Sequence, residues 1–123
     1  MTNDEKLALL REIKGFDAEA GLRSIANMLP AYFRVLGLFV RNHERDKDLL
    51  NTQLKSGDIE AFDVTVHGYK SALANLGALI LSQKAAELEK AAKNNDMAFI
   101  KNNLADFNAE MSDFAEKLNE VIN

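Results

Sequence analysis

The sequence contains no cysteine and a single proline among its 123 residues. The absence of cysteine excludes disulfide bonds, thiolate metal sites and cysteine nucleophiles. One proline and six glycines also argue against a loop-rich or disordered chain. Basic residues do not outnumber acidic ones, since the formal net charge is −4, whereas a nucleic-acid-binding domain usually has a basic face. We therefore expect an ordered domain without a nucleic-acid partner.

Long hydrophobic runs are absent too. The longest apolar stretch, 29–40, is interrupted by Arg34 and is too short for a membrane span of about 20 residues. We expect this stretch to form the most buried helix. The first 13 residues are amphipathic and charged, which does not fit a signal peptide. The expectation is a single cytoplasmic domain, 1–123, without membrane insertion.

Apolar residues recur with helical spacing along nearly the whole chain, and no segment alternates with a period of two. This pattern predicts an all-α fold. Two short helices are expected within 3–27, the first ending at Lys14 before Gly15 and the second capped by Asp17 and reaching about Asn27. Longer helices are expected at about 29–54, 58–75, 78–93 and 96–122.

The turns between the longer helices are short, which forces consecutive helices to be antiparallel neighbours. We therefore predict an up-down-up-down four-helix bundle, with the two short N-terminal helices packed at one end. Within 29–54, the charged run 41–48 includes His43 and predicts a solvated helix face. The helix either continues through this run or kinks before Leu54.

His67 lies opposite the apolar stripe of its helix. At about 100° per residue, the stripe is centred well over 100° away from His67; its members are Ile59, Phe62, Val66, Tyr69 and Leu73. The side chain of His67 is therefore expected to be exposed. Its neighbours on the helix surface are Asp63, Lys70 and Ala74 on one flank and Val64 and Ser71 on the other.

An exposed imidazole with this surrounding suits phosphoryl transfer. Its ordinary pKa is near 6.5, so it is substantially neutral at physiological pH and one ring nitrogen is a free nucleophile. Ser71 and Ala74 leave space for in-line attack, and Lys70 can neutralise phosphoryl charge. The other ring nitrogen needs an acceptor, which the sequence does not identify. A merely solvated surface histidine would have the same placement, so geometry alone leaves both interpretations open.

Lys70, Ser71, Ala74 and Gly77 stand at the third, fourth, seventh and tenth positions after His67. The spacing of these five residues resembles the histidine-containing phosphotransfer (HPt) domain family, and the resemblance covers nearly all of the chain. Gly68 and Tyr69 depart from the residues usual at their positions.

The resemblance implies a phosphorelay carrier in two-component signalling. Such a carrier accepts a phosphoryl group on His67 from a receiver-domain aspartate and passes it to another receiver domain. It implies no kinase or nucleotide site and no cofactor on this chain, with Mg²⁺ supplied by the receiver, and a monomer. Lys70 would stabilise phosphate charge beside a small Ser71, Gly77 would serve helix packing, and the docking face would comprise Asp63, Val64 and Ala74.

Two other functions compete with this interpretation. The chain could be a non-catalytic helical interaction module of the same fold, in which His67 is incidental. A metal- or cofactor-binding bundle is a weaker alternative. The spacing of His43 and His67 does not indicate a metal site, and Glu87, Glu89 and Glu110 lack the Glu-x-x-His pattern of di-iron bundles.

Overall fold

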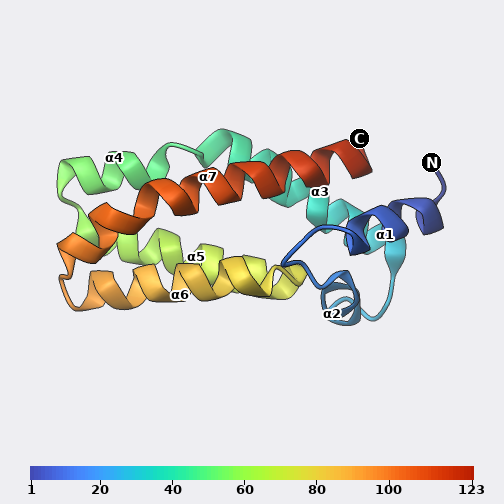
Figure 1. Cartoon of the computed structure of the whole chain (residues 1–123), viewed down its shortest axis with the longest axis horizontal. Coiled ribbons are helices and arrows are strands. Elements are labelled where there is room, and N and C mark those ends of the chain that lie inside the picture. Colours follow the sequence, from blue (N-terminus) through green and yellow to red (C-terminus); the bar gives the residue numbers. More distant parts are fainter.

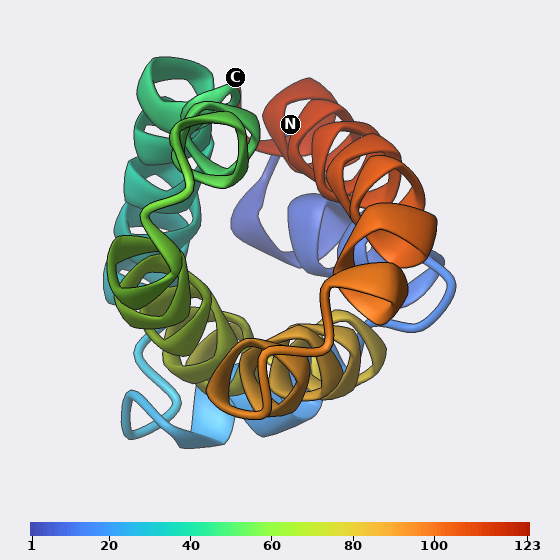
Figure 2. The same cartoon turned by 90° about the vertical axis from the view of Figure 1, so that its left-hand side faces the viewer.

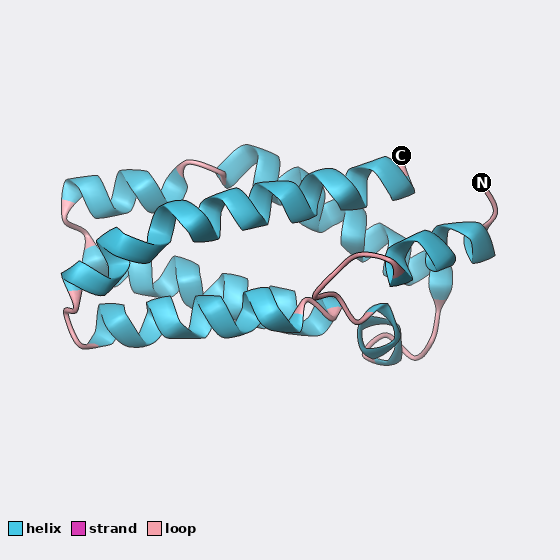
Figure 3. Ribbon diagram, in the orientation of Figure 1, coloured by secondary structure: helices cyan, strands magenta, loops and turns pink.

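The computed structural model describes residues 1–123 and contains seven α-helices. Figure 3 shows helices and loops without any strand. The prediction of an all-α fold is therefore confirmed. The helices are α1 (Asn3–Arg11), α2 (Ala18–Arg23), α3 (Leu29–Asp46), α4 (Leu49–Ser56), α5 (Ile59–Leu76), α6 (Leu79–Lys93) and α7 (Met97–Ile122).

The longer helices run along the long axis of the molecule (Figure 1). Helix α5 packs on α6, α6 on α7, and α7 on α3, while α4 packs on α5. Viewed from the end, α3 and α4 together form one corner and α5, α6 and α7 form the others (Figure 2). The short helices α1 and α2 lie at one end, where α1 packs on α7 and α2 packs on α5. This arrangement is consistent with the predicted bundle.

Apolar stripes of the helices meet in one core. The stripe of α5 is turned inward, because Phe62, Val66 and Leu73 are fully buried. On α7, every third or fourth residue is buried, as expected for a helix packed along its whole length. The members of this stripe are Ile100, Leu104, Phe107, Met111, Phe114, Leu118 and Val121. Since α5 is fixed by this stripe, the opposite face of the helix points to solvent.

Aspartates cap three of the helices. The carboxylates of Asp17, Asp58 and Asp96 each accept a hydrogen bond from the backbone N–H three residues later, at 3.0–3.1 Å. These bonds satisfy donors that have no partner within the helix. Asp17 therefore caps α2 as the sequence predicted, and Asp58 and Asp96 fill the same role at the starts of α5 and α7.

Gly77 ends α5 with a left-handed backbone, at a φ of +97°. Its carbonyl accepts a hydrogen bond from the N–H of Asp17 at 2.8 Å. A Cβ atom at this position would lie 2.0 Å from the carbonyl oxygen of Asp17, so only glycine allows this approach. The contact holds the N-terminal cap of α2 against the turn between α5 and α6.

The ends of the two short N-terminal helices differ from the predicted ones. Helix α1 ends at Arg11 rather than Lys14, and α2 ends at Arg23 because Ala26 and Asn27 adopt positive φ angles of 56° and 58°. Of the two alternatives for 29–54, the structure has the interrupted one, since the segment is divided into α3 and α4 at residues 47–48. Helical hydrogen bonding restarts there, with the N–H of Thr52 donating to the carbonyl of Asp48, a residue type that favours helix starts.

The prediction of a solvated face at His43 is wrong. His43 is only 8% exposed, and its ring stacks on Phe39. Tyr32, Leu36, Phe39 and His43 follow one another at helical spacing, so the inward face of α3 continues into the charged run. Burial lowers the pKa of His43 below its ordinary value. The apolar stretch 29–40, expected to form the most buried helix, is buried on one face only, because Val35 and Leu38 are exposed.

Candidate functional site

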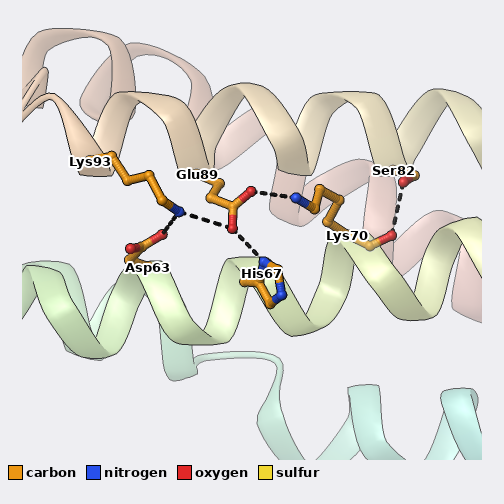
Figure 4. A network of polar contacts seen from close by, with 6 residues as sticks. All are labelled: Asp63, His67, Lys70, Ser82, Glu89 and Lys93. Atoms are coloured by element: carbon orange, nitrogen blue, oxygen red, sulfur yellow. Dashed lines mark hydrogen bonds and ion pairs between the residues drawn. The ribbon is translucent and has the colours of Figure 1, made fainter.

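His67 projects from the exposed side of α5 at its border with α6. Its side chain is 60% exposed, in agreement with its position opposite the buried stripe. Its Nδ1 atom lies 2.5 Å from the Oε2 atom of Glu89 on α6 (Figure 4). The imidazole is thus held at one nitrogen and open at the other.

Glu89 is a buried carboxylate surrounded by cations. The residue is only 7% exposed. Its Oε1 accepts a hydrogen bond from Lys70 Nζ at 2.6 Å, and its Oε2 lies 3.1 Å from Lys93 Nζ. The bond from Lys70, assisted by those from His67 and Lys93, lowers the pKa of Glu89 to about 2 although burial opposes this shift. Glu89 is therefore ionised at neutral pH.

An ionised carboxylate determines the tautomer of a neutral His67. A carboxylate can only accept hydrogen bonds, so the Nδ1 atom facing it must carry the proton. The lone pair of the neutral ring then lies on Nε2. Figure 4 shows that this second nitrogen lies on the side of the ring turned away from Glu89. The acceptor that the sequence left unidentified is Glu89, and the result is an exposed nucleophilic nitrogen.

The hairpin formed by α5 and α6 brings these residues together. The two helices turn back on each other at residues 77–78, so residues at similar distances from this turn face each other. The hydroxyl of Ser82 donates to the carbonyl of Lys70 at 2.8 Å, and Lys93 Nζ lies 3.1 Å from Asp63 Oδ1. Counting ten residues outward from Gly77 pairs His67 with Glu87, so the position of the turn alone does not predict the contact with Glu89. The sequence reasoning missed it because Glu89 was considered only as an iron ligand.

The structure places the remaining predicted residues in two groups. Lys70 and Asp63 belong to the cluster around Glu89, where each forms an ion pair. Ser71, Ala74 and Val64 lie exposed on α5 outside this cluster, with Val64 73% exposed. Gly77 lies at the end of α5 and contacts the cap of α2 instead of the cluster.

The surface beside His67 is open. A Cβ atom built on Gly68 would have no other atom within 4 Å. Gly68 borders a groove of about 410 Å³ between α3 and α5, whose apolar lining includes Val35, Leu38 and Tyr69. A partner surface can thus reach the ring of His67 without displacing bulky side chains.

Two further findings concern metals and membranes. The structure contains no group of three or more histidine, aspartate or glutamate side chains that could hold a metal ion. None of its helices combines the length and the apolar character that crossing a bilayer requires.

Comparison with protein families identifies the class of this protein. The model of the Hpt domain matches residues 34–121, which include His67 and Glu89 and leave α1 and α2 outside. The match extends over well more than half of the chain, and the chain belongs to the Hpt domain family. A search of curated proteins and a search of solved structures each returned no match.

Membership of this family implies histidine phosphotransfer in phosphorelay signalling. Hpt domains are phosphotransfer carriers and not kinases, and they interact with receiver domains of two-component systems.

Proposed function

We propose that this chain is a cytoplasmic, monomeric phosphorelay carrier that receives a phosphoryl group on Nε2 of His67 from one receiver domain and passes it to another. The observation that carries the proposal is the exposed imidazole of His67 with its Nδ1 atom 2.5 Å from the ionised carboxylate of Glu89. This contact leaves the lone pair on the nitrogen that a receiver domain can approach. The up-down-up-down bundle supplies a rigid helix face for it.

The transfer step is a displacement at phosphorus. Nε2 of neutral His67 attacks the phosphorus atom of the receiver's aspartyl phosphate, the N–P bond forms, and the bond from phosphorus to the aspartyl oxygen breaks. The electron pair of that bond leaves with the receiver's carboxylate. The ring gains positive charge and keeps its proton on Nδ1, where Glu89 stabilises it through a charge-assisted hydrogen bond. The reverse displacement delivers the group to the second receiver.

Lys70 and the exposed face of α5 have separate roles in this proposal. The ammonium of Lys70 is bound to Glu89 and lies one turn from His67, where it can offset the charge of the incoming phosphoryl group. The docking face comprises Asp63, Val64, Ser71 and Ala74. The small side chains of Ser71 and Ala74 leave space there for the receiver domain. The receiver domain supplies Mg²⁺ and its own acidic residues, so this chain needs no cofactor.

The proposal is tested by incubating the chain with a phosphorylated receiver domain and measuring acid-labile phosphate on it. We expect His67→Gln to remove phosphoryl acceptance while thermal melts stay close to the parent, because an exposed side chain contributes little to stability. His43→Gln is the matched control, because it changes the other histidine and should leave acceptance intact. Equal labelling of the parent and His67→Gln would contradict the proposal. A parent that binds receivers and never becomes labelled would instead be a non-catalytic interaction module.

A further inference from the structure

Lys93 contacts the same carboxylate oxygen as His67. Its Nζ atom lies 3.1 Å from Oε2 of Glu89, the atom that faces Nδ1 of His67, and 3.1 Å from Oδ1 of Asp63. Figure 4 shows Lys93 reaching from α6 between the two carboxylates. Asp63 comes from α5, one turn before His67. Lys93 is therefore tied to the nucleophile through one shared oxygen.

This contact matters because a carboxylate beside an imidazole has two opposing effects. It fixes the useful tautomer, but it also favours protonation of the ring to the imidazolium. The imidazolium has no lone pair on Nε2 and is not a nucleophile. A site that uses glutamate to orient its histidine must therefore balance the charge of that glutamate.

The charges of the cluster are balanced only when His67 is neutral. Two ammonium groups, from Lys70 and Lys93, face two carboxylates, from Glu89 and Asp63. No charged group of α2, α3, α4 or α7 forms an ion pair with these residues. Protonating His67 would give the cluster an uncompensated positive charge.

We propose that Lys93, oriented by Asp63, is a positioning residue that keeps His67 in its neutral, nucleophilic form by offsetting the charge of Glu89. The inference rests on the proposed function of His67 and adds that Lys93 acts on the protonation state of its ring. Ion pairing with Asp63, and next with Glu89, raises the pKa of Lys93, so it stays charged over the working range of pH.

The test compares variants of opposite charge. Lys93→Gln leaves the cluster with one excess negative charge, whereas Asp63→Asn leaves one excess positive charge. The double variant restores the balance. Lys90→Gln is the matched control, because it removes a charge from the same last turn of α6 without breaking an ion pair. Lys93→Arg keeps the charge and should behave like the parent.

Phosphoramidate serves as the phosphoryl donor, so that receiver docking does not enter the measurement. In this reaction the N–P bond to Nε2 forms, the donor's P–N bond breaks and ammonia leaves. Initial rates are measured for each variant from pH 5 to 9 and divided by those of the parent. The titration and tautomer of the ring are followed in parallel by ¹⁵N NMR.

For Lys93→Gln we expect the acid limb of the rate profile to move to higher pH by about 0.5–1 unit, since a nearby charge commonly shifts titration by this much or more. The rate near pH 6 should then fall about three- to tenfold and approach the parent's rate above pH 8. Asp63→Asn should move the limb in the opposite direction, and the double variant should lie between them.

Unchanged profiles and unchanged ring titration in both single variants would overturn the inference and leave the function of His67 in place. A uniform loss of rate at every pH would also overturn it, because that result indicates a structural role. A parent that is not phosphorylated on His67 would overturn the proposed function instead. The ring titration measured by NMR would still decide the inference in that case.

Discussion

Replacing Glu89 by glutamine should slow phosphoryl acceptance, because the amide satisfies only part of what the carboxylate binds. If the amide oxygen takes the place of Oε2 and accepts from Nδ1 of His67, the NH₂ group faces the ammonium of Lys70, donor against donor. If the amide is reversed, its NH₂ faces Nδ1, and the neutral ring then carries its proton on Nε2. Glutamine therefore loses either the Lys70 contact or the nucleophilic tautomer.

The size of the effect follows from the charge of the lost contact. Hydrogen bonds to charged groups contribute about 1.5–3 kcal/mol, compared with about 0.5–1.5 kcal/mol for neutral ones. The developing positive charge on His67 would thus lose about 1.4 kcal/mol of stabilisation, which corresponds to an approximately tenfold slower step. Glu89→Ala removes the acceptor altogether, and the loss of up to about 3 kcal/mol from a charged hydrogen bond predicts an approximately hundredfold slower step.

The assay is single-turnover transfer from a phosphorylated receiver domain to each variant. Glu87→Gln is the matched control, because Glu87 is exposed on the same helix and forms no ion pair with the cluster. The tautomer of His67 is read from ¹⁵N shifts in the same samples. Transfer within twofold of the parent in both Glu89 variants, or an unchanged tautomer in Glu89→Ala, would refute the reasoning.

The same substitution changes the response of stability to acid. The pKa of Glu89 is about 2 in the folded chain and near its ordinary value of 4.5 when unfolded. Between these values the unfolded state binds more protons, so the stabilisation from Glu89 is present above pH 4.5 and is lost as the pH falls toward 2. Denaturant melts should show a shallower loss over this range for Glu89→Gln than for the parent.

Three further predictions concern the scaffold. Gly77→Ala should lower the free energy of unfolding by at least about 3 kcal/mol in denaturant melts, because a left-handed backbone and a 2.0 Å contact with the α2 cap both oppose a Cβ. Gly57→Ala is the control, because Gly57 has a φ of +77° but open space around it, and it should lose only about 1–2 kcal/mol. Leu73→Ala should lower the free energy of unfolding by about 2–5 kcal/mol through a cavity in the core, whereas Val64→Ala, at an exposed position, should lower it by about 0.5 kcal/mol or less. Similar melts for the two variants would show that the inward stripe is misassigned. The parent should lose stability as the pH falls below about 6.5, because burial lowers the pKa of the folded His43 imidazole and the unfolded chain takes up the proton first. His43→Leu should show a smaller loss over this range, and equal losses in the parent and the variant would contradict this.

Much of the helical framework could be predicted from local residues. The caps at Asp17, Asp58 and Asp96 and the break at Gly77 depend on neighbours within a few positions, so the sequence marks them directly. The exposure of His67 was equally accessible, because the stripe of its own helix determines which side faces the core. The position of the division between α3 and α4 could not be predicted from the sequence, since charged residues suit both a continuous helix and a break.

The sequence by itself determined the helical class and the display of one histidine on an open helix face, because both depend on the periodicity of a single helix. It also determined the capped turns, because a cap depends on residues only a few positions away. Only the tertiary structure decided what lies across from that histidine. The register of α6 against α5 brings Glu89 to Nδ1 and Lys93 to the same oxygen, and the packing of α3 buries His43. Those contacts depend on side chains many residues apart in the sequence, and their positions are set by how the helices pack together.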